Sequence, residues 1–307
     1  MLEQALLTIA IPTYNRAHVV KLLAESVISQ LLPGDELLVV DDCSTDATSN
    51  LLEGIADLRY YKQPSNQGMV QNWNSCLQLA KNDWVCIIHD DDILCPGALD
   101  ALRKACSIAS EPCLIMHQQT YKHVNSFFRY KIYSPGPSAV FCSASGTIPS
   151  GIVTHKEIVS AIGGFDTEFC YSADVEYFAR INTKYKLLVI ESPAIVVYQI
   201  HNDNYQYKTW LEPDFFPQLL EIERRVISYS GLKGAMASDL FNKRIVGYLE
   251  YILTQAKRLN NKTLMRKYGS LLWKSRSYGK RLRLRGLAST ITSYLPFGQT
   301  TAPKLMS

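Results

Sequence analysis

The sequence predicts an α/β fold in which helices cover both faces of a mostly parallel sheet, followed by a helical C-terminal extension. Short apolar runs alternate with helical patterns over residues 6–107, which is the order expected when crossover helices join parallel strands. From residue 212 the pattern is helical. A chain of 307 residues is long enough for one large domain and an appendage. We therefore expect one domain over residues 1–210 and a basic helical extension over residues 211–307.

The expected strands of the N-terminal half are short apolar runs that end at Pro, Asp or another polar residue. They cover residues 6–11, 36–40, 59–62 and 84–88. The helices expected after each strand carry apolar residues on one face, and breaks such as Pro-Gly-Asp separate them from the next strand. They cover residues 19–31, 44–55, 69–80 and 95–107.

The pattern is looser after residue 107. Residues 112–150 are rich in aromatic residues, Ser and Pro, with strand-like pieces at 114–118 and 127–133. The elements expected beyond them are helices at 157–162 and 174–184 and a strand at 187–197. Within the extension, an apolar stripe marks one helix face. It consists of Leu264, Tyr268, Leu271 and Leu272.

Composition indicates a globular protein of a reducing compartment. Hydrophobic residues make up 47% of the chain and charged residues 20%, and no apolar run approaches the ~20 residues that a membrane-spanning helix needs. The eight cysteines form no C-x-x-C pair, so buried free thiols are favoured over a disulfide framework. We therefore expect a cytoplasmic protein.

Acidic residues follow two of the predicted strands. Asp41 and Asp42 end the second strand, and Asp90, Asp91 and Asp92 follow the fourth. Because open parallel sheets bind ligands at the carboxyl ends of their strands, these clusters should lie near each other. Adjacent carboxylates repel one another, and a hard divalent cation such as Mg²⁺ or Mn²⁺ relieves the repulsion and prefers oxygen ligands. The pattern favours a metal–pyrophosphate site over a solvated acidic turn.

Six motifs, taken in order, resemble those of the family-2 glycosyltransferases, which have the GT-A fold. They are residues 9–16 (IAIPTYNR), 39–46 (VVDDCSTD), 66–68 (NQG), 89–92 (HDDD), 163–166 (GGFD) and 173–174 (AD). Each motif is moderately specific by itself, whereas their shared order and spacing is strongly specific. The resemblance spans residues 6–205, about two thirds of the chain.

The resemblance implies a nucleotide-sugar site at the ends of the first strands. Pro12 and Tyr14 match the segment that packs on the donor base, Asp42 matches the acid that hydrogen-bonds the base, and Asp90 matches the acid near the ribose. The residues implied to bind the nucleotide sugar are Pro12, Thr13, Tyr14, Asn15, Asp42, Asn66, Gly68 and Asp90.

The resemblance also implies a metal ligand and a catalytic base. Asp91 matches the principal ligand of Mn²⁺ or Mg²⁺, His201 matches a histidine near the metal or the diphosphate, and Asp174 matches the base. The sequence departs from the family at His89, where many members have Asp, and at Ala173, where members often have Glu. Without the resemblance, a helix N-cap is the favoured interpretation of Asp174. A structural histidine is an equal alternative for His201.

The implied reaction is the inverting, metal-dependent transfer of a sugar from a nucleotide-diphosphate sugar, with UDP favoured, to a hydroxyl of the acceptor. A cation stabilises the leaving diphosphate, and one carboxylate accepts the hydroxyl proton. A glycan or lipid-linked acceptor of surface polysaccharide or lipopolysaccharide biosynthesis is expected. Two alternatives remain, a nucleotidyltransferase with a similar acid–metal site and a catalytically inactive nucleotide-sugar-binding module.

The net charge of +4 hides an asymmetry along the chain. No acidic residue follows Glu250, and residues 251–307 hold twelve Lys or Arg interleaved with aromatic and aliphatic residues. This composition favours an anionic membrane surface as partner. Nucleic acid is not expected, because no nucleic-acid-binding signature accompanies the charge, and a solvated charged helix is the remaining alternative. We expect a peripheral protein on the inner face of the membrane.

Overall fold

The computed structural model describes residues 5–118, 127–145, 149–199 and 208–274. The chain divides into two compact units. The first comprises residues 1–202 and 224–232, and the second comprises residues 203–223 and 233–307. Helix α9 (Phe215–Tyr229) therefore contributes residues to both units.

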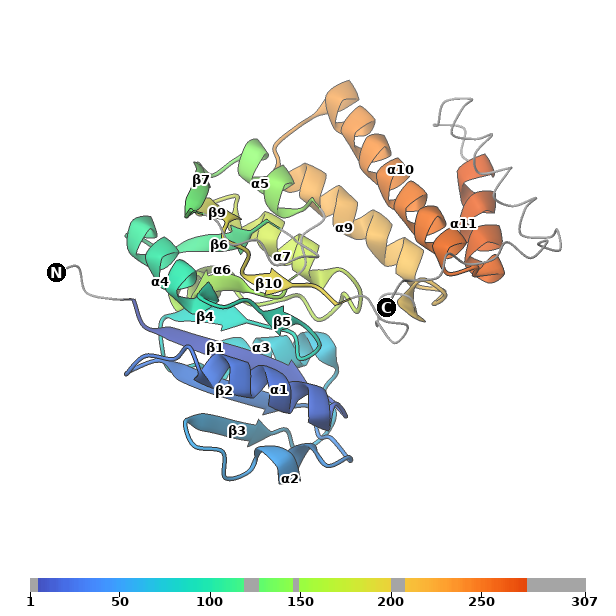
Figure 1. Cartoon of the computed structure of the whole chain (residues 1–307). Coiled ribbons are helices and arrows are strands. Elements are labelled where there is room, and N and C mark those ends of the chain that lie inside the picture. The colour runs from blue at the N-terminus through green and yellow to red at the C-terminus, as the bar shows by residue number, and fades with distance from the viewer. Residues whose placement is uncertain (1–4, 119–126, 146–148, 200–207, 275–307) are drawn as a thin grey trace. The chain divides into compact units, whose positions relative to one another are not determined.

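The described part of the first unit is built on an eight-stranded sheet in the order β3-β2-β1-β4-β8-β6-β9-β7 (Figure 1). Its strands are β1 (Leu7–Thr13), β2 (Glu36–Asp41), β3 (Leu58–Lys62), β4 (Trp84–Ile87), β6 (Cys113–His117), β7 (Arg129–Tyr133), β8 (Ile152–His155) and β9 (Lys186–Ser192). Neighbouring strands run parallel except where β8 pairs with β4 and β6 and where β7 pairs with β9. The predicted α/β class with a mostly parallel sheet is confirmed.

Strand β1 lies between β2 and β4 and runs parallel to both. Thr13 pairs with Asp41 of β2, and Ala10 pairs with Ile87 of β4. The three strands are almost entirely buried, so they read in the sequence as apolar runs rather than as alternating patterns. Because the three strands are parallel, the polar segments that follow them all lie at the carboxyl ends of the strands.

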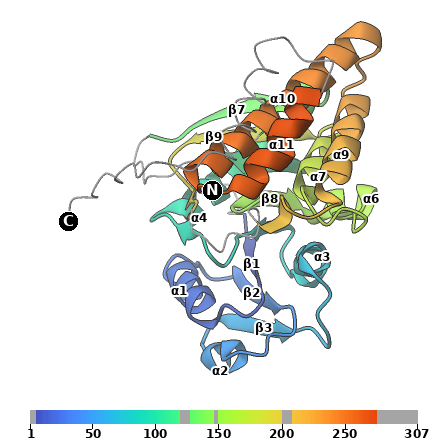
Figure 2. The same ribbon diagram turned by 90° about the vertical axis from the view of Figure 1, so that its right-hand side faces the viewer.

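Helices cover both faces of this half of the sheet. Helix α1 (Ala17–Ile28) and helix α3 (Met69–Leu79) lie on opposite sides of β1 and β2 (Figure 2). Helix α1 buries residues at every third or fourth position, which is the pattern of a helix with one apolar face. Helix α4 (Ala98–Ala109) contacts β6 and β9. The predicted helices at 19–31, 69–80 and 95–107 thus correspond to helices of the structure.

The predicted helix over residues 44–55 is shorter in the structure, where α2 covers only Thr48–Leu52. The preceding residues form a turn around the Asp46 carboxylate. That carboxylate accepts hydrogen bonds from the amides of Thr48 at 3.0 Å and Ala17 at 3.1 Å. Because Asp46 satisfies donors at the starts of two helices, residues 44–46 remain outside helix α2.

The sequence did not predict two elements between residues 134 and 156. Helix α5 (Pro137–Ser143) begins at a proline, which suits a first helical turn. Strand β8 has four residues and lies in the sheet between β4 and β6. Both elements are too short to show a periodic pattern in the sequence.

The strand expected over residues 187–197 is two strands in the structure. Strand β9 ends at Ser192, and β10 (Val196–Val197) pairs antiparallel with β5 (Ile93–Leu94) in a separate two-stranded sheet. Pro193 follows β9 and has no amide hydrogen to donate to a continuing strand. Helices α6 (Lys156–Ile162) and α7 (Ala173–Ile181) agree with the predicted helices at 157–162 and 174–184, α7 ending earlier.

The second unit is helical in its described part, as predicted. Helices α10 (Gly234–Arg258) and α11 (Lys262–Lys274) pack against each other. The predicted stripe of α11 is fully buried at Leu264, Tyr268 and Leu272, and the Tyr268 hydroxyl donates to the Trp210 carbonyl at 2.7 Å. None of the described helices combines the length and the apolar character that crossing a membrane requires.

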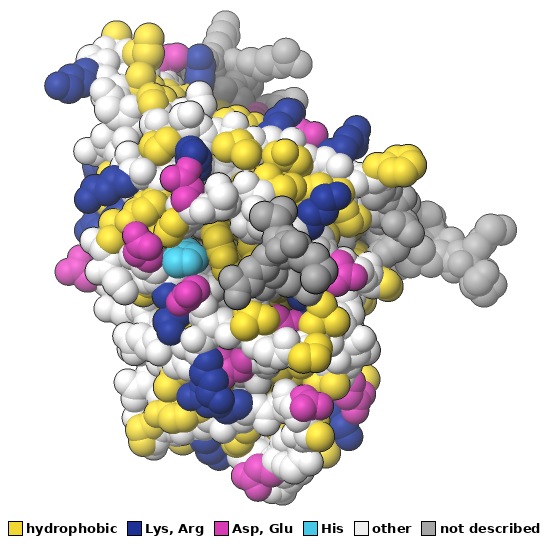
Figure 3. All heavy atoms as spheres, turned by 90° about the vertical axis from the view of Figure 1, so that its left-hand side faces the viewer, with side chains coloured by type: hydrophobic (Ala, Val, Ile, Leu, Met, Phe, Trp, Pro, Cys, Tyr) yellow, Lys and Arg dark blue, Asp and Glu magenta, His cyan; other side chains and the backbone are white. Residues whose placement is uncertain are grey.

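The cysteines agree with the prediction of free thiols. All eight lie in the described residues, none forms a disulfide, and five are buried. Several belong to the hydrophobic core that surrounds β1 and β2. On the surface, Figure 3 shows a face where acidic, basic and hydrophobic side chains are intermixed, without a single-sign charged patch.

Candidate functional site

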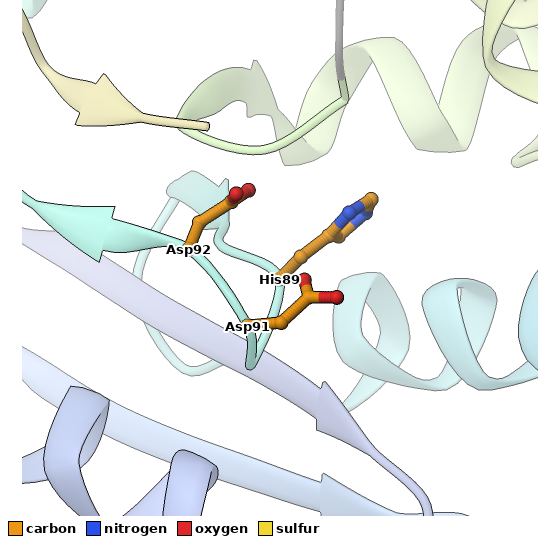
Figure 4. Close-up of side chains that lie close together, drawn as sticks. All are labelled: His89, Asp91 and Asp92. Carbon is orange, nitrogen blue, oxygen red and sulfur yellow. The ribbon is translucent and has the colours of Figure 1, made fainter. Parts of the chain in front are cut away.

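The loop after β4 brings three possible metal ligands together. His89, Asp91 and Asp92 project from this loop (Figure 4), and one ligand atom of each lies within 4.8 Å of the others. Two atoms of the group, His89 Nε2 and Asp92 Oδ2, are buried and have no hydrogen-bond partner. Unpaired buried polar atoms are unfavourable unless a ligand satisfies them. Imidazole and carboxylate atoms in this arrangement fit a divalent cation.

Asp91 was predicted as the principal metal ligand and Asp92 as a member of the acidic cluster, whereas His89 was not predicted to be a metal ligand. The position of Asp92 depends on distant residues. Its Oδ1 accepts from the Gln199 amide at 3.2 Å. Ser150 Oγ accepts from the His89 amide at 3.0 Å. The third acid of the loop therefore joins the group through contacts that the local sequence does not contain.

The His89 ring is held by an aromatic neighbour. It stacks on Trp73 of α3 with 5.5 Å between ring centroids and 14° between ring planes. Burial lowers the pKa of His89 and thus favours the neutral imidazole. A neutral imidazole offers a nitrogen lone pair, which is the form that ligates metals.

Arg16 lies against the same loop. Its Nη1 donates to Asp90 Oδ1 at 3.1 Å and to Asp91 Oδ2 at 2.5 Å. Thr13 Oγ1 donates to the second oxygen of Asp90 at 2.7 Å. Burial by itself would lower the pKa of Arg16, but the two carboxylates raise it above its ordinary value. The end of β1 and the loop after β4 thus form one polar network.

Burial weakens two acids of this loop, Asp90 and Asp92. It raises the pKa of Asp90 to about 6 and that of Asp92 to about 7, and hydrogen bonds and Arg16 only partly oppose the effect on Asp90. A bound divalent cation favours the charged carboxylates and so opposes the effect of burial. The electrostatics of the loop agree with the unpaired atoms in favouring a cation there.

The loop that follows β2 positions the segment after β1. Asn15 has a positive φ of 54°; its amide donates to Ser44 Oγ and its side-chain oxygen accepts from the Thr45 amide, both at 2.8 Å. Asn tolerates this left-handed conformation better than most residues. Tyr14 is 47% exposed, and Pro12 is half-buried. The predicted residues 12–15 therefore form an ordered turn with an exposed aromatic ring.

Asp42 organises the start of helix α3. Its Oδ1 accepts from the Gln67 amide at 2.7 Å and its Oδ2 accepts from the Gly68 amide at 2.9 Å. The Asn66 side-chain amide donates to the Asp42 carbonyl at 3.3 Å. The structure thus brings together the predicted residues Asp42, Asn66 and Gly68. A carboxylate has further lone pairs beyond the two used here.

Asp174 lies in the first turn of α7 and is buried. Burial raises the pKa of its carboxyl to about 6, against hydrogen bonds from the amides of Val175 and Asp174 itself. The helix N-cap is Ser172 and not Asp174. A carboxylate with a pKa near neutrality suits a general base.

Aromatic contacts connect α7 with the metal-ligand group. Trp73, which stacks on His89, also contacts Phe165 with 5.2 Å between centroids, and Phe165 contacts Tyr177 of α7 at 4.3 Å. Asn74, beside Trp73 on α3, donates to the Phe165 carbonyl at 2.9 Å and accepts from the Phe165 amide at 2.8 Å. The predicted GGFD segment is thereby fixed between α3 and α7.

Two predicted features lie outside the described residues. His201 belongs to residues 200–207, and six of the twelve Lys and Arg of residues 251–307 belong to residues 275–307. Gln199, the last described residue before His201, is the one whose amide donates to Asp92.

The mostly parallel sheet, with acidic residues after its central strands, agrees with the expected GT-A fold. Residues 8–139 match the family model of Glycosyl transferase family 2. The match agrees with the resemblance to this family that the sequence motifs show. The matched region includes the acidic loop and ends before Asp174.

Two relatives have similar sequences. An uncharacterized glycosyltransferase of Haemophilus influenzae is 24% identical over 202 residues, which cover 64% of this chain and 66% of that protein. The GalNAc(5)-diNAcBac-PP-undecaprenol beta-1,3-glucosyltransferase of Campylobacter jejuni is 31% identical over 101 residues, which cover 31% of this chain and 33% of that protein. The chain spans 66% and 61% of the length of the first two relatives that it matches.

Two solved structures share the fold. S. aureus TarS residues 1–349 in complex with UDP-GlcNAc gives a TM-score of 0.63 at 16% identity, covering 94% of this chain and 89% of TarS 1–349. The mannosyltransferase PcManGT from Pyrobaculum calidifontis, in complex with GDP-Man and Mn²⁺, gives a TM-score of 0.57 at 17% identity, covering 95% of this chain and 86% of that one. At these identities the likeness concerns the fold alone.

Proposed function

We propose that this protein transfers a sugar from a nucleotide-diphosphate sugar to a hydroxyl of a glycan or lipid-linked acceptor, with inversion at the sugar carbon and with Mn²⁺ or Mg²⁺ as cofactor. The observation that carries the proposal is the loop after β4, where buried, unpaired atoms of His89 and Asp92 lie beside Asp91. This loop follows a central strand of the sheet, and the β1 end adjoins it. Residues 1–210 are proposed to carry out this reaction.

Asp91, His89 and Asp92 would hold the cation, and His201 is proposed as a further ligand from the sequence. The cation supplies charge stabilisation to the diphosphate as it leaves. For the donor, we assign Tyr14 and Pro12 to the base, with Asn15 in the same turn, and Asp90 with Thr13 to the ribose. Asp42 is proposed to hydrogen-bond the base, and Asn66 and Gly68, which contact Asp42, are proposed to bind the donor beside it.

Asp174 is proposed to accept the proton of the acceptor hydroxyl. As that proton moves to the carboxylate, the hydroxyl oxygen forms a bond to the sugar carbon. The bond from this carbon to the diphosphate oxygen breaks, and the nucleoside diphosphate leaves with the bonding electrons. A single base is enough for this displacement, which inverts the configuration at the carbon. The raised pKa of Asp174 makes its carboxylate a better proton acceptor than an ordinary Asp.

A uridine donor and a lipid-linked acceptor are the favoured partners. The related TarS structure contains UDP-GlcNAc, and the Campylobacter relative is named for an undecaprenol-linked substrate. The excess of Lys and Arg in residues 251–307 suits an anionic membrane surface. We therefore propose that residues 211–307 dock the protein on the inner face of the membrane, where lipid-linked surface glycans would serve as acceptors.

Thermal stabilisation tests the donor and the cofactor together. The melting temperature of the full chain is measured with UDP, GDP, UDP-GlcNAc and GDP-mannose, each with Mn²⁺, with Mg²⁺ and with EDTA. Ligands that bind only the folded state raise the melting temperature. We expect a clear increase with UDP or UDP-sugar and Mn²⁺, and a much smaller one with EDTA.

The variant Asp91→Asn identifies the site. It keeps the size of the side chain but removes a negative ligand, so the Mn²⁺-dependent part of the increase should disappear. Asp100→Asn, which changes an exposed acid of α4, is the matched control and should behave as wild type. Equal stabilisation with and without metal in the wild-type chain would reject the metal-dependent function.

A further inference from the structure

Arg16 pairs with a carboxylate that a metal ion at this loop would also bind. A single nitrogen, Nη1, lies 3.1 Å from Asp90 Oδ1 and 2.5 Å from Asp91 Oδ2. It therefore bridges the acid proposed to contact the ribose and the acid proposed to bind the cation. Guanidinium and metal compete for the oxygen of Asp91, because a cation needs the lone pairs that Nη1 uses.

We propose that Arg16 is an exchangeable counter-ion, which holds Asp90 and Asp91 in the metal-free protein and moves to the diphosphate of the donor when metal and donor bind. The inference rests on the proposed function, from which it takes the cation at Asp91. It adds a residue that sets metal affinity and couples it to the binding of the nucleotide.

The exposure of the three side chains supports exchange. Arg16 is 28% exposed, whereas Asp90 and Asp91 are 9% and 17% exposed. Asp90 is also fixed by the hydrogen bond from Thr13. The cation of this ion pair thus has access to solvent, while one of its two acids is fixed in place.

A purely structural ion pair of this chain looks different. Arg103 and Asp35 form an ion pair whose side chains are 3% and 0% exposed, and Arg103 also donates to the Gln30 carbonyl at 2.9 Å. Arg103 also pairs with Asp100 at 2.7 Å, so three groups of the protein hold its guanidinium in place. Within the described residues, the side-chain hydrogen bonds of Arg16 all go to the two acids of the site.

The backbone of Arg16 is fixed at the start of α1, so only its side chain would move. Its carbonyl accepts from the amides of Val19 at 3.1 Å and Val20 at 3.0 Å, which makes Arg16 the N-cap of α1. The helix start favours negative charge nearby. A guanidinium binds phosphate through paired hydrogen bonds. Once a divalent cation neutralises Asp90 and Asp91, the diphosphate is the stronger partner for Arg16.

Metal affinity without nucleotide tests the first half of the proposal. Binding of Mn²⁺ to the full chain is followed by electron paramagnetic resonance of the free ion, for wild type, Arg16→Gln and Arg16→Lys. Arg16→Gln should bind Mn²⁺ about tenfold more tightly, because the competing charged hydrogen bonds are gone. Arg16→Lys keeps a competing cation and should stay within about threefold of wild type.

Arg59→Gln is the matched control. Arg59 also pairs with a carboxylate, Glu36, at 2.8 Å. It lies near the start of β3, whereas the acidic loop follows the end of β4. The variant changes the net charge by the same amount but leaves the acidic loop intact. Its Mn²⁺ affinity should equal that of wild type, and a tightening as large as that of Arg16→Gln would mean that net charge alone acts.

Nucleotide affinity tests the second half. Isothermal titration of UDP at saturating Mn²⁺ should show about tenfold weaker binding to Arg16→Gln, because the phosphate loses a charged donor. One substitution is thus expected to tighten metal binding and weaken nucleotide binding. Unchanged or weaker Mn²⁺ binding in Arg16→Gln overturns the counter-ion role, and unchanged UDP binding overturns the transfer to the diphosphate.

Failure of the proposed function gives a different result. If Asp91→Asn binds Mn²⁺ as wild type does, the metal site is not at this loop, and both proposals are rejected. If Asp91→Asn loses Mn²⁺ while Arg16→Gln matches wild type, the metal site stands and only the role of Arg16 is rejected.

Discussion

At the scale of single residues, burial of acids is the main property of the site. Asp90, Asp92 and Asp174 are all buried, and burial is the largest cause that raises each pKa. A stable fold gains nothing from charged groups removed from water. Such groups concentrate where a protein binds cations or moves protons.

Replacement of Asp174 tests its role as a base. Asp174→Asn removes the proton acceptor and keeps the shape, so turnover should fall about 10³-fold. The dissociation constants of donor and Mn²⁺ should stay within about threefold of wild type. Turnover and calorimetric binding of UDP measure the two effects. A loss of donor affinity as large as the loss of turnover would show that Asp174 binds the donor instead.

The same substitution should stabilise the fold in a pH-dependent way. The pKa of Asp174 is about 6 in the folded protein and 3.8 as an ordinary Asp. The contribution of this group to stability is therefore fully present below pH 3.8 and is lost as pH rises through 6. At pH 8, Asp174→Asn should be about 1–3 kcal/mol more stable than wild type.

Urea denaturation at pH 8 and at pH 4 measures this difference. At pH 4 the difference in stability should be much smaller, because Asp174 is protonated in the folded state and partly protonated in the unfolded state. Asp83→Asn changes an exposed acid. This control should leave the free energy of unfolding within about 0.5 kcal/mol of wild type at both pH values. Equal stability of Asp174→Asn and wild type at pH 8 would contradict the cost of burying this charge.

At the scale of elements, the GGFD segment depends on a close contact with α3. A Cβ added to Gly164 would lie 2.2 Å from Asn74 Oδ1. That oxygen accepts from the Phe165 amide, so it cannot move without losing a buried hydrogen bond. Arg180 of α7 also donates to the Gly164 carbonyl at 2.7 Å. Only glycine fits between the two helices here.

Gly164→Ala should therefore destabilise the protein by about 1–3 kcal/mol. The control is Gly247→Ala in α10, where a Cβ meets nothing within 4 Å. That change should be neutral or stabilise by about 0.5–1 kcal/mol, because alanine favours a helix. Thermal melts of the two variants decide the matter. A Gly164→Ala protein as stable as wild type would show that Asn74 is free to move.

Sequence reasoning recovered the elements whose patterns are local. The strands β1, β2 and β4 are buried apolar runs, and α1 and α11 have one-faced stripes. The missed strand β8 is four residues long and owes its place to pairing with β4 and β6. Its partners are distant in sequence, so periodicity could not show it.

The candidate site was predictable to the same extent. Asp91, Asp42 and Asp174 follow from motifs. His89 and Asp92 join the metal-ligand group through Ser150, Gln199 and Trp73. These three residues lie on other segments of the chain, and no local pattern connects them with the acidic loop. The sequence shows that the segment after β4 is acidic. It does not show which atoms of that segment are buried without hydrogen-bond partners.

At the scale of the whole molecule, charge is divided unevenly along the chain. The segment after Glu250 holds twelve Lys or Arg and no acidic residue, whereas the chain before it has a net negative charge. A basic residue near an anionic leaflet gains about 1 kcal/mol, and salt screens this gain. The proposed docking surface should therefore act through electrostatics, with interleaved apolar residues adding to it.

Membrane binding is tested with Arg281, Arg283 and Arg285 changed together to Gln in the full chain. Co-sedimentation with vesicles that contain phosphatidylserine should fall at least about tenfold relative to wild type. Wild type should bind neutral vesicles weakly and should leave anionic vesicles at about 1 M salt. UDP-dependent stabilisation should be unaffected. Equal binding of wild type to anionic and neutral vesicles would exclude an electrostatic attachment.

The distribution of the thiols makes one position of the chain chemically addressable. Cys170 is exposed, five of the other cysteines are buried and two are partly buried. Burial raises the pKa of Cys113 to about 12 and raises those of Cys76, Cys86 and Cys106, so these thiols form little of the reactive thiolate at neutral pH. Maleimide should attach first at Cys170, four residues before Asp174. Because Asp174 is the proposed base, a fluorophore at Cys170 should report the binding of an acceptor.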